Sequence, residues 1–133
     1  MNAHATAHSD PGAVRVLLAI SHGRTRAALR TALERSGEIE VAALVSTTVH
    51  LARMAAIERV DVVVFDLRLA PPGTSPSLAD LVASLGGIPL IAVGLEGDPA
   101  FARAALLSGA SAHVLTDETP ERYLDVVWDV HRR

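Results

Sequence analysis

The stretch Asp61-Val-Val-Val-Phe-Asp66 decides the fold of this chain. Its central residues are all apolar and mostly β-branched, which is typical of a strand covered on both faces in a parallel sheet. Asp66 stands at the carboxyl end of that strand, and open parallel sheets bind their ligands at this end. The stretch therefore predicts a central buried strand that brings a carboxylate to a functional edge.

Apolar strands and helical patterns alternate on both sides of this stretch. Asp98-Pro99 and Thr119-Pro120 each place a capping residue before a proline, which is typical of a helix start, and Thr47 or Thr48 is expected to cap an earlier helix. We expect strands at about 14–20, 40–45, 61–65, 88–93 and 112–115, and helices at about 24–36, 48–59, 77–85, 99–108 and 120–131. This alternation through short loops predicts an α/β fold with a parallel sheet and helices on both faces.

The length of 133 residues fits one domain. Residues 1–12 are small and polar and read as a disordered tail, and residues 13–133 form the expected domain. The formal charge is −3 and no basic stripe is present, which argues against a nucleic-acid-binding surface. No apolar run approaches the ~20 residues that span a membrane. We therefore expect a cytoplasmic domain that binds neither nucleic acid nor membrane directly.

The composition excludes several kinds of chemistry. The chain has no cysteine, and its lysine and arginine total of 12 consists of arginine alone. Thiolate and lysine chemistry are therefore excluded, and no glycine-rich nucleotide-binding motif occurs. The polar segments expected after the strands are Ile20-Ser21-His22, Asp66-Leu67-Arg68, Gly94-Leu95-Glu96 and Thr116-Asp117.

A set of short motifs occurs in a fixed order along the chain: Val16-Leu-Leu-Ala19, Val60-Asp-Val-Val-Val-Phe-Asp-Leu-Arg68, Pro71-Pro-Gly73, Ser108-Gly-Ala110 and Thr119-Pro-Glu121. Together they resemble the CheY-like receiver domain of bacterial response regulators, in particular those of NarL type. The resemblance covers residues 14–132. It implies a flavodoxin-like receiver fold with strand order 2-1-3-4-5, a role in two-component signal transduction and transcription regulation, and Asp66 in the phosphoacceptor position.

The magnesium site of that family is incomplete in this sequence. Receivers neutralise the incoming phosphoryl group with Mg²⁺, a hydroxyl and a lysine. The acidic pair that holds the Mg²⁺ is replaced here by Ile20 and Ser21. Because Mg²⁺ prefers six oxygen ligands and relies on carboxylates, Asp66 alone makes a poor site. We expect no magnesium, other metal or cofactor.

The other positions of the phosphorylation machinery also depart from the family pattern. The hydroxyl position is Gly94, the lysine position is Thr116, and His113 stands where receivers usually have the switch Tyr or Phe. The resemblance then implies an atypical pseudo-receiver, a regulatory module and not an enzyme, with Asp66 as a vestigial phosphoacceptor. The alternative role for Asp66 is a capping carboxylate that accepts backbone N–H bonds from the following loop.

Three arginines are expected near Asp66: Arg24, Arg26 and Arg68. One of them would keep the carboxylate ionised by pairing with it, as an opposite charge within ~4–6 Å does. Arg26 and Arg68 also belong to the NarL-type pattern, and we interpret them as solvated surface residues. Arg24 is the one of the three that the pattern does not lead us to expect. His22 belongs to the pattern too, and one histidine with one carboxylate is too little for a specific metal site.

The last predicted helix carries an apolar pair outside its core-facing stripe. Leu124 and Trp128 are four residues apart on a face that is normally polar. An exposed tryptophan beside a leucine is a candidate hot spot, so we expect a homodimer or a protein partner to dock here. The alternative is that Trp128 folds over the edge of the domain.

Other functions stay open at this point. In one alternative, Asp66 is still phosphorylated, and Ser21 and water complete a weak Mg²⁺ site. In a second alternative, the chain is a ligand-sensing module. Its pocket would lie between Ser21, Asp66, Gly94 and Thr116, where the glycine leaves space. A small flavodoxin-like enzyme has least support, because no convergent acid, base and oxyanion donors are found. Since the chain stops at Arg133, we expect either a single-domain regulator or the N-terminal part of a DNA-binding one.

Overall fold

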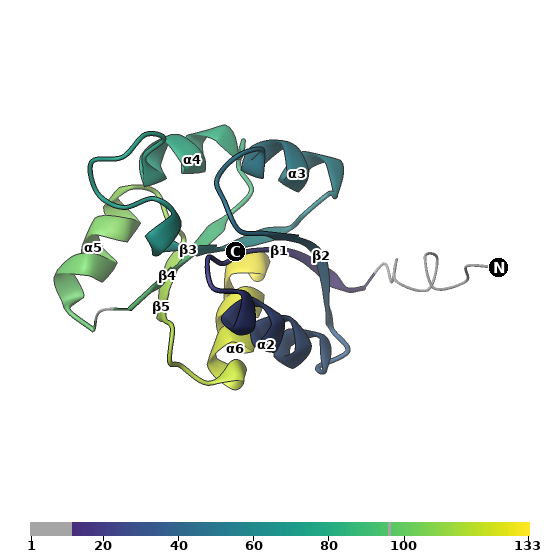
Figure 1. The fold of residues 1–133 in the computed structure, drawn as a ribbon. Coiled ribbons are helices and arrows are strands. Elements are labelled where there is room, and N and C mark those ends of the chain that lie inside the picture. The colour runs from purple at the N-terminus through teal and green to yellow at the C-terminus, as the bar shows by residue number, and fades with distance from the viewer. Residues whose placement is uncertain (1–11, 96) are drawn as a thin grey trace.

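Five parallel strands form the centre of the molecule (Figure 1). The computed structural model describes residues 12–95 and 97–133, and its strands pair in the order β2-β1-β3-β4-β5. This order confirms the predicted fold class. The tail predicted at residues 1–12 lies outside the described residues apart from Gly12. The strands are β1 (Val14–Ala19), β2 (Ile39–Val45), β3 (Val62–Asp66), β4 (Leu90–Gly94) and β5 (Ala112–Leu115).

Helices cover both faces of this sheet, as Figure 1 shows. One face carries α2 (Gly23–Glu34) and α6 (Pro120–Arg132). The other carries α3 (Leu51–Ile57), α4 (Leu78–Ser84) and α5 (Pro99–Leu107). A short 3-10 helix, η1 (Leu67–Leu69), follows β3 directly. The sheet is therefore buried on both sides, as the apolar strands predict.

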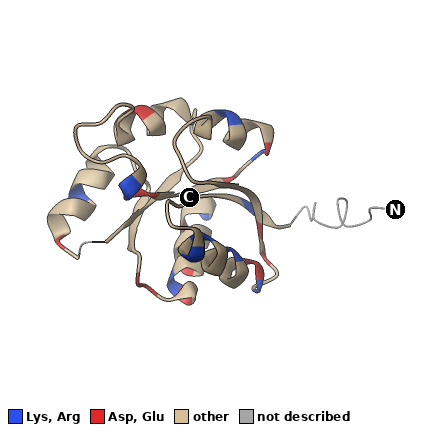
Figure 2. Ribbon diagram, in the orientation of Figure 1, with Lys and Arg blue, Asp and Glu red and all other residues tan. Residues whose placement is uncertain are grey.

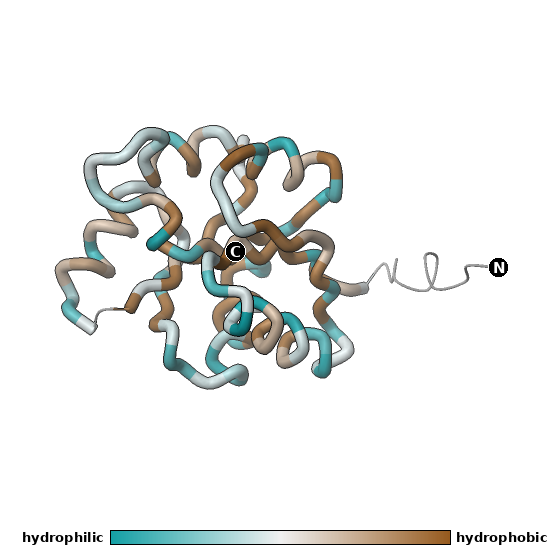
Figure 3. The backbone as a smooth tube through the Cα atoms, in the orientation of Figure 1, coloured by the Kyte–Doolittle hydropathy of each residue, from teal (hydrophilic) through white to brown (hydrophobic). Residues whose placement is uncertain are grey.

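Successive side chains of the strands enter two different apolar clusters. In β1, Val14, Val16 and Leu18 belong to the cluster under α2 and α6, whereas Leu17 and Ala19 belong to the cluster under α3, α4 and α5. All five are at most 1% exposed. Because neighbouring residues of a strand point to opposite faces, one continuous apolar run serves both clusters. The hydrophobic segments at the centre of Figure 3 follow these strands.

Two of the predicted helix starts are confirmed. A carboxylate oxygen of Asp98 accepts a hydrogen bond from the Ala100 N–H at 2.9 Å, and the Thr119 hydroxyl accepts one from the Arg122 N–H at 3.3 Å. In each case proline takes the next position, where its missing N–H costs nothing.

The predicted cap of the second helix is wrong. That helix begins at Leu51 and follows His50, and neither Thr47 nor Thr48 caps it. The Thr47 hydroxyl instead accepts a hydrogen bond from the Val49 N–H, and the Leu51 N–H bonds to the Thr48 carbonyl. Threonine side chains form such local turns in competition with helix capping.

Charged residues of both signs are interspersed over the helices and loops in Figure 2. Within residues 12–95 and 97–133, no helix has the length and apolar character needed to cross a membrane.

Replacing Leu18 by alanine is expected to lower the free energy of unfolding by about 2–5 kcal/mol, because this 0% exposed side chain leaves a cavity behind it. Leu107 is 80% exposed on α5, so Leu107→Ala is the matched control and should change stability by less than about 0.5 kcal/mol. Urea denaturation measures both variants. Equal losses in the two would contradict this assignment of the core.

Candidate functional site

Asp66 ends β3 at the carboxyl edge of the sheet, between β1 and β4. It is 2% exposed, and it is the only buried polar residue in the described part of the chain. A carboxylate removed from water is tolerated only when hydrogen bonds and an opposite charge replace its hydration. The partners of Asp66 therefore define the chemistry of the site.

The segment after β1 supplies two of these partners. The backbone N–H of Ser21 donates to Oδ2 of Asp66 at 3.0 Å, and the Ser21 hydroxyl donates to the same oxygen at 2.7 Å. Ile20 is 1% exposed and belongs to the cluster under α2 and α6. Position 21 therefore contributes two hydrogen-bond donors to this edge, position 20 is part of the core, and neither position supplies a carboxylate.

Arg68 supplies the opposite charge. Its Nε lies 3.1 Å from Oδ1 of Asp66, and its Nη2 lies 3.0 Å from Oδ2. The backbone N–H of Arg68 donates to Oδ1 at 3.0 Å, so Asp66 also caps η1, as its alternative role predicts. Bidentate pairs of this kind combine strength with a fixed geometry.

The pKa of Asp66 results from opposing effects. Burial raises the pKa because it disfavours the charged form, but the hydrogen bonds from Arg68 and Ser21 together lower it by more. The net pKa lies below the usual value. The charged form of the partner is favoured as well, because the hydrogen bond with Asp66 raises the pKa of Arg68. The pair is therefore a carboxylate held by a guanidinium.

The residues present do not fit the Mg²⁺ that the resemblance to receivers implies. Both oxygens of Asp66 already accept hydrogen bonds from Ser21 or Arg68. The guanidinium 3.0 Å away also repels a second cation. His22 is exposed and lies 3.4 Å from the Thr25 hydroxyl. Across the described ranges, no group of three or more His, Asp or Glu side chains is placed to hold a metal ion.

The other two arginines do not pair with Asp66. Arg26 donates from Nη1 to the Ile20 carbonyl at 2.8 Å, and the side chain of Arg24 makes no hydrogen bond or ion pair with the described residues. Arg68 does lie at the surface, with its side chain 39% exposed, but the interpretation of it as an unpaired, solvated residue is wrong. Its position two residues after a strand-ending aspartate was the available signal, because the turn of η1 folds the guanidinium back onto the carboxylate.

His113 occupies the space beside Gly94. A Cβ added at residue 94 would lie 2.7 Å from Nε2 of His113 and 3.5 Å from Cδ1 of Leu67. Burial lowers the pKa of His113, which the charge of Glu118 partly opposes. Its Nε2 is buried and has no hydrogen-bond partner among the described residues. The space that glycine leaves is therefore filled by a neutral imidazole.

Thr116 joins the ends of β4 and β5 instead of contacting the carboxylate. Its N–H and its hydroxyl both donate to the Gly94 carbonyl, at 2.9 and 3.0 Å. A cavity of about 550 Å³ is lined by Gly94 but by none of Ser21, Asp66 and Thr116, so it is not the pocket predicted between these four residues.

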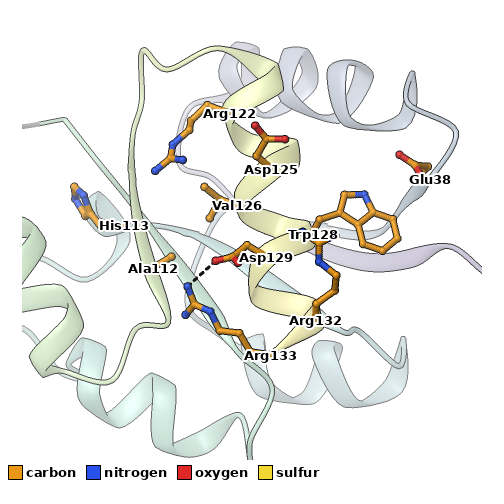
Figure 4. A pocket seen from close by; sticks show the side chains of 10 residues that line it. All are labelled: Glu38, Ala112, His113, Arg122, Asp125, Val126, Trp128, Asp129, Arg132 and Arg133. Atoms are coloured by element: carbon orange, nitrogen blue, oxygen red, sulfur yellow. Dashed lines mark hydrogen bonds and ion pairs between the residues drawn. The ribbon is translucent and has the colours of Figure 1, made fainter.

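A second hollow, of about 630 Å³, lies along α6 (Figure 4). Trp128 and Leu124 are half-buried and pack against the cluster under α2 and α6, so the expectation of an exposed tryptophan is wrong. The indole meets the His131 ring edge-on, with centroids 6.0 Å apart. Figure 4 shows acidic and basic side chains around Trp128, including the ion pair of Arg133 with Asp129 at 2.8 Å.

The strand order and the carboxylate at the end of β3 define the receiver fold. The signal receiver domain of the response regulator NarL from Mycobacterium tuberculosis is 24% identical, with a TM-score of 0.79 over 92% of this chain and 98% of that one. A LuxR-family two-component response regulator from Aurantimonas is 23% identical, with a TM-score of 0.79 over 90% of this chain and 86% of that one. The response regulator ChrA of a heme-sensing two-component system is 29% identical, with a TM-score of 0.71 over 91% of this chain and 58% of that one. No protein-family model and no curated protein matches the sequence.

Asp66→Asn is expected to destabilise the protein by roughly 1–3 kcal/mol at neutral pH, because the new amide meets N–H donors of Ser21 or Arg68 in either orientation. The wild-type pKa of Asp66 is lowered, so its stabilising contribution is complete above about pH 4 and declines as the pH falls below that value. Thermal melts between neutral and acid pH should therefore converge for the two proteins.

The matched control for this variant is Asp129→Asn. Asp129 also pairs with an arginine, Arg133, but its side chain is 62% exposed. Exposed pairs contribute little to stability, so this change should be much smaller than that of Asp66→Asn. Similar losses of stability in the two variants would show that the Asp66 pair contributes no more than an exposed ion pair does.

Gly94→Ala is expected to destabilise the protein by roughly 1–3 kcal/mol, because its Cβ lies too close to the His113 ring. Removing the ring in the double variant Gly94→Ala, His113→Ala should relieve most of this conflict. A double-mutant cycle from chemical denaturation measures the coupling. Additive effects would mean that the imidazole does not occupy this space.

Proposed function

We propose that this chain is an atypical receiver, a regulatory module of two-component type that signals without phosphorylation of Asp66. One observation carries the proposal: the Arg68 guanidinium is held on the Asp66 carboxylate through Nε and Nη2. A carboxylate that attacks a phosphoryl donor needs an accessible, nucleophilic oxygen. Both oxygens of Asp66 are engaged by donors, so Arg68 would first have to leave.

The same arginine provides the positive charge for which receivers depend on Mg²⁺ and lysine. Charge near a phosphorylation site must balance the incoming phosphoryl group in the transition state. Here the guanidinium already balances the carboxylate itself, 3.0 Å away, before any phosphoryl group arrives. We infer that Asp66 is kept in a neutralised state that needs no kinase.

Regulation would then proceed through contacts and not through chemistry. Ser21 donates to Asp66 through its N–H and hydroxyl, and Arg68 donates to it through Nε and Nη2, so we infer no acid, base and oxyanion set for catalysis at this edge. We propose that a second copy of the chain or a protein partner docks on α6, around the half-buried Trp128 (Figure 4). The neighbouring acidic and basic side chains suit a two-fold contact, in which each arginine of one copy meets an aspartate of the other.

Incubation with acetyl phosphate and Mg²⁺, followed by intact-mass analysis, is expected to leave the wild-type protein unmodified. A phosphorylatable receiver treated in parallel should gain one phosphoryl group and serves as the positive control. A phosphoryl adduct on the wild type that is lost in Asp66→Asn would overturn the proposal.

Arg68→Gln identifies the cause of the block. An adduct that forms only in this variant would mean that the guanidinium itself prevents the reaction. Absence of an adduct from both proteins would attribute the block to the missing acidic pair and lysine as well, at positions 20, 21 and 116. Circular dichroism should establish first that the variant is folded.

A further inference from the structure

An apolar cavity of about 550 Å³ adjoins the site and lies between the segment after β3, α4 and α5. Its volume is within the range of about 300–1,000 Å³ that small-molecule sites occupy. Leu95 and Phe101 at the cavity are 60% and 49% exposed, so its walls present apolar surface to water. The principal apolar lining residues are Leu67, Pro71, Leu78, Leu95, Phe101 and Ala105.

Arg68 is the only ionisable side chain among the described residues that line this cavity. Nε and Nη2 of Arg68 donate to Asp66, whereas Nη1 donates to no described residue. A guanidinium has five N–H donors arranged in a plane, so its free edge can hold a second acceptor while the first edge stays occupied. The strongest acceptor for such an edge is a carboxylate.

The other polar side chains of the lining each have a hydrogen-bond partner within the protein. The Ser77 hydroxyl accepts the Asp80 N–H at 3.1 Å, and the Ser108 hydroxyl donates to the Ala104 carbonyl at 3.0 Å. The cavity therefore combines an apolar wall with one cationic anchor and no acidic side chain among its described lining residues.

We propose that this cavity binds a small molecule with an apolar body and a carboxylate group. The body lies against Leu67, Leu78 and Phe101, and the carboxylate accepts hydrogen bonds from the Nη1 edge of Arg68. The ligand and Asp66 then share one guanidinium. Binding does not require Asp66 to be unreactive, so a failure of this proposal and a failure of the proposed function are separate results.

A second copy of the chain is the competing occupant, and the exposed leucines of α5 distinguish the two. Leu106 and Leu107 are 47% and 80% exposed and do not line the cavity. A protein partner buries roughly 800 Å² per side and would cover these leucines as well. A small molecule would leave them exposed.

Isothermal titration calorimetry with octanoate and decanoate, set against 1-octanol and octylamine, tests the proposal on the full chain. Octanoate should bind at least about tenfold more tightly than the alcohol, because its charge-assisted hydrogen bonds are stronger. Affinity should rise roughly two- to fourfold for each added methylene group. The amine should not bind.

Two alanines of α5 provide matched variants. Ala104 lines the cavity and Ala100 does not, and both are exposed. Ala104→Phe should weaken octanoate binding by at least about tenfold, whereas Ala100→Phe should leave it unchanged. Arg68→Gln should remove the preference for carboxylate over alcohol while alcohol binding persists. If Arg68→Gln fails to fold, the alanine pair and the head-group series still decide the outcome.

The proposal is overturned if the wild type binds no carboxylate, if octylamine binds as tightly as octanoate, or if Ala104→Phe binds octanoate as the wild type does. Analytical ultracentrifugation tests whether a second copy of the chain occupies this surface instead. Self-association that is lost in both Ala104→Phe and Leu107→Ala would assign the surface to a second copy of the chain and would also overturn the proposal.

Discussion

A carboxylate that is 2% exposed at the end of a fully buried strand must have its counter-charge close by, and this requirement organises the edge of the sheet. β3 can place Asp66 there only because Arg68 turns back onto it and Ser21 reaches it from β1. The parallel pairing of β1 with β3 brings that serine within reach. Without the guanidinium, only the hydrogen bonds from Ser21 and the Arg68 backbone would oppose the rise in the pKa of Asp66 that burial causes. The local turn of η1 and the order of the strands are thus both needed to stabilise the one buried carboxylate.

The fold was predictable because local signals agreed with one another along the chain. Continuous apolar runs, caps followed by proline and short loops all favoured a parallel sheet, and most apolar residues in those runs belong to one of two clusters. Strand ends were less predictable. The fourth strand begins at Leu90 and not at residue 88, and the Pro89 carbonyl bonds to the Val63 N–H just before it. The ends of a strand are set by its pairing with neighbouring strands, which a local sequence pattern does not show.

The site was predictable only as a set of positions. The sequence located Asp66 and the departures around it, but it ranked the three nearby arginines wrongly, because the choice depends on which side chain the backbone turns toward the carboxylate. The space beside Gly94 shows the same limit. The absence of a side chain at Gly94 predicted an empty space, yet His113, nineteen residues along the chain on the neighbouring strand, fills it. Packing between strands decides whether a small residue leaves a hole.

The short separation of Asp66 and Arg68 in the chain has a consequence for how such a module keeps its state. The two groups are joined by one intervening residue, so the effective concentration of the guanidinium at the carboxylate does not depend on the amounts of protein, nucleotide or metal. A phosphoryl group on an aspartate decays by hydrolysis, and the signal it carries fades with it. A charge encoded in the sequence lasts as long as the polypeptide does. Under the proposed function, competition for the guanidinium or replacement of the molecule, and not dephosphorylation, sets the persistence of the signal.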